Sequence, residues 1–122
     1  MKPKIKKKWI EDLRSGKFEQ GKHNLRSVDD KYCCLGVLCD IYVREQDEDD
    51  ERNNWSKYYA DTDTYSVDGR TSFPSPKILE WAGLNKGTVT LDINGEPVEI
   101  IDLNDVEGYS FEQLADLIEE QY

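Results

Sequence analysis

The chain has 122 residues, which is enough for a single domain with one modest hydrophobic core. Its formal net charge of −10 disfavours direct binding to nucleic-acid phosphates or to anionic membrane surfaces. No apolar segment approaches the roughly 20 residues that span a bilayer, and no secretory signal follows the N-terminal lysines. We therefore expect one cytoplasmic domain over residues 1–122.

The first predicted element is an amphipathic helix over residues 4–15. Ile5, Trp9 and Leu13 recur every four residues and form one apolar stripe, and Gly16 is placed to end the helix. Lysines in the first turn oppose the helix dipole, so we expect this start to fray into a solvated tail rather than to bind nucleic acid. The cluster consists of Lys2, Lys4, Lys6, Lys7 and Lys8.

Residues 32–43 are the most hydrophobic segment and predict a buried central helix, because they are apolar nearly all round. Asp29 and Asp30 precede the segment, where aspartate is a favoured N-cap. Gly36 inside the helix costs about 1 kcal/mol relative to alanine, which indicates that another element packs closely against it. The preceding residues 23–28 predict at most a short strand or an ordered loop.

Residues 45–73 are predicted to form a long, insertion-like loop. Its first part is an acidic run, and such runs stay solvated. Its second part contains aromatic residues without periodicity, and loops of this length are more often functional than accidental. The acidic run includes Asp47, Glu48, Asp49, Asp50 and Glu51.

The C-terminal half contains clear local signals. Ser75 followed by proline predicts a helix over 76–82, and Ser110 with glutamine three residues later is a capping box that predicts a helix over 110–120. Between them, alternating apolar residues around an Asn-Gly turn predict a hairpin over 88–101. The sequence therefore indicates an α+β fold, in which this small antiparallel sheet, with a possible extra strand at 23–28, packs against about four helices.

The three cysteines and the single histidine are the first candidates for chemistry. Cys33, Cys34 and Cys39 lie in one apolar segment, which favours core packing in a reducing compartment over a zinc site or a disulfide framework. A Cys–His nucleophile that uses His23 is the remaining alternative, without a recognisable third group. We predict no metal site, no cofactor and no catalytic residue.

A group of cationic and amide side chains is the stronger candidate for binding. Arginine is suited to bidentate capture of phosphate or carboxylate, and aromatic rings can stack on a nucleobase. The alternative is that the arginines pair with the many acidic residues of the chain. The candidate ligand-binding residues are Arg14, Gln20, Lys22, Arg26, Trp55 and Tyr58.

Three groups of residues resemble a family of small phage and prophage proteins. The first combines a Trp-x3-Leu-Arg-Ser-Gly pattern with Phe18, Gln20, Gly21, Leu25 and Arg26, the second is the Cys-Cys-Leu-Gly-Val-Leu stretch at 33–38, and the third runs from Leu103 to Phe111. The resemblance covers residues 1–43 and 88–122. It implies a phage origin and a location in the host cytoplasm, without an activity that transfers.

Together these observations favour a phage accessory protein that acts by binding rather than by catalysis. The leading hypothesis is counter-defence through sequestration of a small nucleotide signal. The main alternative is that the acidic run at 47–51 mimics nucleic acid and inhibits a host protein. A Cys/His enzyme and a virion component are further alternatives, and a homo-oligomer is left open.

Overall fold

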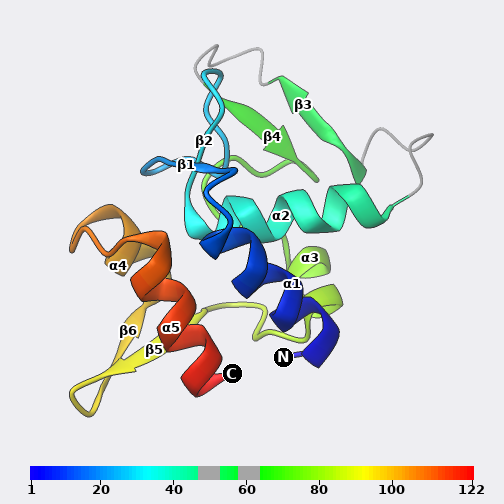
Figure 1. The fold of residues 1–122 in the computed structure, drawn as a ribbon. Helices are drawn as coiled ribbons and strands as arrows, with labels where there is room; N and C mark the ends of the chain where they lie inside the picture. Colours follow the sequence, from blue (N-terminus) through cyan, green and yellow to red (C-terminus); the bar gives the residue numbers. More distant parts are fainter. Residues whose placement is uncertain (47–52, 58–63) are drawn as a thin grey trace.

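The computed structural model describes residues 1–46, 53–57 and 64–122. In these ranges it contains five helices and three two-stranded sheets, so the predicted α+β class is confirmed (Figure 1). The helices are α1 (Pro3–Arg14), α2 (Cys34–Glu45), α3 (Pro76–Ala82), α4 (Ile100–Asp105) and α5 (Phe111–Gln121). The parallel strands are β1 (Glu19–Gln20) and β2 (Lys31–Tyr32), and the antiparallel pairs are β3 (Trp55–Lys57) with β4 (Tyr65–Val67) and β5 (Thr90–Ile93) with β6 (Glu96–Glu99).

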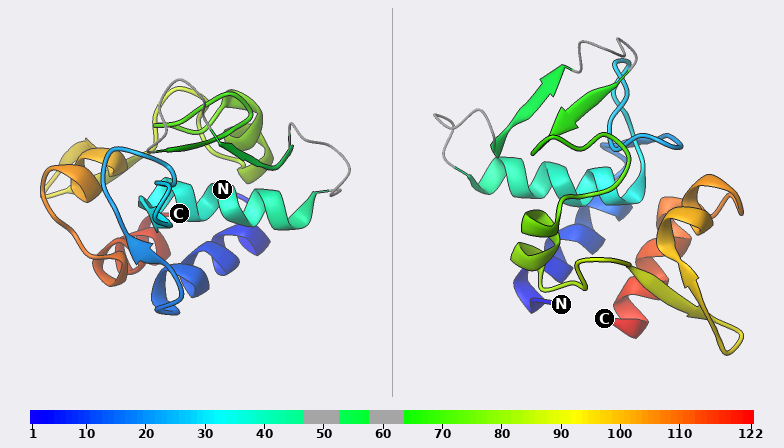
Figure 2. Two further views of the ribbon diagram at one scale, coloured as in Figure 1. Left: turned by 90° about the horizontal axis from the view of Figure 1, so that it is seen from above. Right: turned by 180° about the vertical axis from the view of Figure 1, so that it is seen from behind.

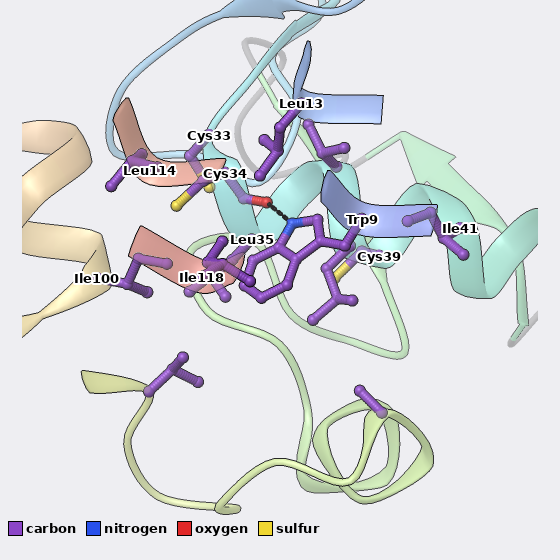
Figure 3. Close-up of a cluster of buried hydrophobic side chains, with 14 of the residues drawn as sticks. Trp9, Leu13, Cys33, Cys34, Leu35, Cys39, Ile41, Ile100, Leu114 and Ile118 are labelled. Carbon is purple, nitrogen blue, oxygen red and sulfur yellow. Dashed lines mark hydrogen bonds between the residues drawn. The ribbon is translucent and has the colours of Figure 1, made fainter. Parts of the chain in front are cut away.

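Helix α2 lies at the centre of the molecule, between α1 on one side and the β3–β4 pair on the other (Figures 1 and 2). Helix α1 packs against both α2 and α5. The fully buried Trp9 indole N–H donates to the Cys34 carbonyl oxygen at 2.9 Å, so this large ring enters the core with its polar atom satisfied (Figure 3).

Helix α2 begins two residues later than the sequence predicts, because residues 31–32 form β2. Its N-cap is Cys33, not an aspartate, and Cys33 makes no side-chain capping bond. Instead, the first free amide, that of Cys34, donates to Oδ1 of Asn104 at 3.3 Å. The expected close approach at Gly36 is confirmed: a Cβ atom there would lie 1.7 Å from the Leu25 carbonyl oxygen.

The N-terminal lysines do not form a frayed tail, so that expectation is wrong. The helix begins at Pro3, and the Lys2 amide donates to the Ala82 carbonyl oxygen at 3.0 Å. The Lys6 ammonium donates to the carbonyl oxygens of Glu119 and Tyr122 at the end of α5. These tertiary contacts outweigh the unfavourable dipole interaction, which falls off within one turn.

The predicted hairpin is present, and Asn94 and Gly95 both have positive φ (54° and 88°), as a type I′ turn requires. Its second strand is shorter than expected, because Ile100 starts α4 and its amide donates to the Val89 carbonyl oxygen. Residues 23–28 do not extend this sheet. They form isolated bridges instead, Arg26 to Tyr32 and Ser27 to Thr64.

Both predicted helix starts are confirmed in the structure. The Ser75 hydroxyl accepts from the Ile78 amide, and Ser110 and Gln113 form the complete capping box. The short spacing of these residues makes their bonds local, and this explains why the sequence alone reveals them.

Candidate functional site

The predicted ligand-binding residues are distributed over three different surroundings. Arg14 faces α5 and forms ion pairs with Asp116 (2.6 Å), Glu119 (3.2 Å) and Glu112 (3.7 Å). Hydrogen bonds to the Glu119 and Asp116 carboxylates raise the pKa of Arg14 further above its ordinary value. Its guanidinium therefore serves to join α1 to α5.

Gln20 belongs to a polar network around Asn104, whose side chain is buried in the described structure. The Gln20 side-chain amide donates to Asn104 Oδ1 and to the Tyr109 carbonyl oxygen, both at 2.8 Å, and accepts from the Phe111 amide. Asn104 Nδ2 in turn donates to the Gly21 carbonyl oxygen at 2.9 Å. Each polar atom of the Gln20 and Asn104 amides is thus bonded within the protein, so this network ties β1, α2, α4 and α5 together.

Lys22 is exposed at the edge of this network, beside a hollow of about 210 Å³. Gln20 and Asn104 also line this hollow, and their amide groups are already bonded within the protein. The sequence-based reasoning missed Asn104 as a structural residue. The available signal was its place in the Leu-Asn-Asp stretch of the phage-like resemblance, but nothing local indicated that it caps a helix 70 positions away.

Arg26 and Trp55, in contrast, are brought together. The Arg26 guanidinium carbon lies 4.3 Å from the ring centroid of Tyr65, 5.4 Å from that of Tyr32 and 5.5 Å from that of Trp55. Its Nε and Nη2 both donate to one oxygen of Asp30, at 2.9 and 2.7 Å. We call these five residues the Arg26 cluster.

Backbone pairing positions the cluster. Tyr32 comes from β2, Trp55 from β3 and Tyr65 from β4. The carbonyl oxygen of Arg26 accepts from the Tyr65 amide at 2.8 Å, which holds the arginine beside β4. The Trp55 indole N–H donates to Asp40 Oδ1 on α2 at 3.0 Å, and the Tyr32 and Trp55 rings meet edge to face at 6.1 Å.

The Arg26 cluster is half open to solvent. The Arg26 side chain is 20% exposed, whereas that of its counter-ion Asp30 is 62% exposed. Burial raises the pKa of Tyr32 to about 12, so this ring stays a neutral phenol around pH 7. A partly desolvated guanidinium among aromatic rings, with an exposed carboxylate as its partner, is chemically suited to exchange that carboxylate for another anion.

The cysteines are buried and free, as the sequence predicts. Burial raises the pKa of Cys33 to about 12 and those of Cys34 and Cys39 well above their ordinary value, so the thiols are protonated at neutral pH. His23 is 73% exposed and lies 3.7 Å from Asp105. A protonated, buried thiol lacks the properties of a catalytic nucleophile. The described residues contain no cluster suited to a metal ion.

Two further predictions fall outside the described residues. These are the stacking residue Tyr58 and the acidic run Asp47, Glu48, Asp49, Asp50 and Glu51. Of the helices in the described ranges, none has the length and apolar character needed to cross a bilayer.

A family model described as a domain of unknown function, DUF8296, matches residues 1–122. No curated protein and no solved structure matches the chain.

Proposed function

The chain belongs to the DUF8296 family, and we propose that it is a binding protein that captures a small anionic ligand with a planar ring, of the nucleotide class, at the Arg26 cluster. The observation that supports this most directly is the position of the Arg26 guanidinium, which lies within 5.5 Å of three aromatic ring centroids and is paired only with the exposed Asp30 among the described residues.

The two halves of such a ligand match the two kinds of group in the cluster. The planar fork of arginine can donate two parallel hydrogen bonds to a phosphate. The rings of Trp55 and Tyr65 offer stacking surface for a base, an interaction that contributes about 1–3 kcal/mol per base in nucleic-acid-binding proteins. The combination favours nucleotides over simple anions, which would use the cation alone.

A binding role also agrees with the chemistry of the rest of the described chain. The thiols are buried and protonated, and the Asn104 network is saturated, so neither competes with the Arg26 cluster as a functional site. The resemblance to phage proteins supplies the setting that we propose: an accessory protein in the host cytoplasm that sequesters a nucleotide signal of a defence system. Sequestration requires affinity and no catalytic group.

The first test is isothermal titration calorimetry with the 5′-monophosphates of adenosine, guanosine, cytidine and uridine, their 3′,5′-cyclic forms and the unphosphorylated nucleosides. We expect binding of at least one nucleotide, with weaker binding of its nucleoside. Arg26→Lys keeps the charge but loses the planar fork, so it should weaken binding at least fivefold. Arg14→Lys is the matched control, because Arg14 is also ion-paired but lies outside the Arg26 cluster.

Two results would refute this function. The first is that calorimetry detects no binding of any nucleotide, and that native mass spectrometry of protein exposed to infected-cell lysate also shows no retained small molecule. The other is equal loss of binding in Arg14→Lys and Arg26→Lys, with both variants folded by circular dichroism. In a phage-infection assay, Arg26→Lys should reduce protection of the phage, whereas Arg14→Lys should preserve it.

A further inference from the structure

Asp30 occupies an unusual place in the Arg26 cluster, because both donors of the Arg26 fork converge on a single oxygen. Nε and Nη2 of Arg26 lie 2.9 and 2.7 Å from Asp30 Oδ1. The fork can instead donate one bond to each of two oxygens, as it does with phosphate. Among the described residues, these two donors of the fork therefore meet one acceptor oxygen where they could meet two.

The backbone holds the Asp30 carboxylate in this position. Asp30 has a φ of 60°, in the left-handed region that aspartate and asparagine tolerate better than most residues. Its amide donates to the Ser27 carbonyl oxygen at 2.9 Å, which closes a turn, and the Ser27 hydroxyl accepts from the Lys31 amide at 3.1 Å. A hydrogen-bonded turn thus fixes the backbone of Asp30, so that its carboxylate faces Arg26.

We infer that Asp30 is an internal competitor for the anion site: it occupies the position of a ligand phosphate oxygen, and the ligand binds by displacing it. This inference rests on the proposed function and adds the selectivity of the site. A monoanionic group that offers one oxygen exchanges like for like with Asp30. A carboxylate or a phosphate can each offer two oxygens to the fork, but a terminal phosphate also carries a second negative charge, so the competition selects phosphate monoesters over carboxylates by charge and over uncharged nucleosides by the absence of an anion.

The neighbouring Asp29 supplies a matched control within the same turn. Its side chain is 62% exposed, as is that of Asp30. It accepts from the Ser27 hydroxyl and lies 3.7 Å from the Lys31 ammonium, and it makes no bond to Arg26. Asp29→Asn and Asp30→Asn therefore remove the same charge from adjacent positions, and only the second frees the fork. Asparagine also suits the positive φ at position 30, so the turn is expected to persist.

The test is calorimetry of the wild type, Asp30→Asn and Asp29→Asn with the 5′-monophosphates of adenosine, guanosine, cytidine and uridine and with their nucleosides. In Asp30→Asn the ligand no longer has to displace an exposed ion pair from Arg26. Monophosphate binding should therefore tighten about two- to fivefold. Asp29→Asn should change monophosphate binding by less than about twofold, and nucleoside binding should stay the same in all three proteins.

The outcomes separate this inference from the proposed function. Monophosphate binding to the wild type that is unchanged in Asp30→Asn, or tightened equally in Asp29→Asn, overturns the competitor role and leaves the binding function standing. Binding that appears only in Asp30→Asn supports the competitor role. If none of the three proteins binds any monophosphate, the competitor role falls, and the proposed function is then decided by the cyclic nucleotides and by native mass spectrometry.

Discussion

Replacing Asn104 with alanine is expected to destabilise the protein strongly, although the residue belongs to a short helix near the surface. Its side chain is 1% exposed and makes bonds to three other parts of the chain. Oδ1 accepts from the Cys34 amide and from the Gln20 side chain, and Nδ2 donates to the Gly21 carbonyl oxygen. Alanine removes all of these bonds and leaves the first amide of α2 without its acceptor.

The magnitude follows from the groups that lose their partners. The Cys34 amide is buried, and an unsatisfied buried donor costs about 1–3 kcal/mol. The Gly21 carbonyl oxygen is partly buried and adds a smaller penalty, while Gln20 keeps its bond to Tyr109. We therefore expect a loss of about 2–4 kcal/mol in the free energy of unfolding.

The assay is equilibrium urea unfolding followed by far-ultraviolet circular dichroism. Asn85→Ala is the control, because Asn85 is exposed and accepts from the nearby Gly87 and Thr88 amides, so its replacement should cost less than about 1 kcal/mol. If Asn104→Ala lowered the free energy of unfolding no more than Asn85→Ala, and the slope of that free energy against urea concentration were equal in both variants, the network would not hold the helices together.

The remaining predictions concern backbone contact, capping and the thiols. Gly36→Ala should prevent native folding, because its Cβ would lie 1.7 Å from a backbone oxygen of Leu25, whereas Gly87→Ala, whose Cβ would make an ordinary 3.6 Å contact with Asn85 Oδ1, should fold; nuclear magnetic resonance spectra of both variants decide this. Ser110→Ala should lower the free energy of unfolding by about 1 kcal/mol in urea titrations, and an unchanged value would exclude a stabilising cap. Cys33 should resist iodoacetamide in the native state at pH 8 and react after unfolding, so rapid native labelling would contradict its burial. Because burial raises the pKa of the folded thiols, only the unfolded chain loses these protons near pH 9, and stability should fall above that pH by up to about 1.4 kcal/mol per pH unit for each thiol; a flat profile between pH 8 and 10 would contradict this.

Much of the secondary structure is determined by short-range interactions that the sequence makes visible. The caps at Ser75 and Ser110 each need only the residue three positions later. The turn at 94–95 needs two residues that accept positive φ, and Asn and Gly supply them. The apolar stripe of α1 is likewise visible, since helical spacing is a local property. The glycine at position 36 indicates a close contact, but that the contact is with Leu25 follows from the tertiary structure.

The binding residues could be predicted only in part. Arginine and aromatic residues in an acidic chain indicate anion binding in general, and Arg26 and Trp55 do meet in the structure. Arg14 carries the same charge and was an equal candidate, yet it pairs with α5. Residue type states what a side chain is able to bind, but which neighbours compete for it depends on the fold.

The tertiary structure alone decided the features that join distant segments. Helix α2 begins at Cys34 because residues 31–32 pair with β1, and Asn104, 70 residues away, accepts a hydrogen bond from the first amide of the helix. The N-terminal lysines are ordered because Lys2 and Lys6 find carbonyl oxygens on α3 and α5. The sequence by itself determined local geometry, whose energies arise within a few residues, whereas bonds between distant positions exist only once packing has brought their atoms within about 3 Å.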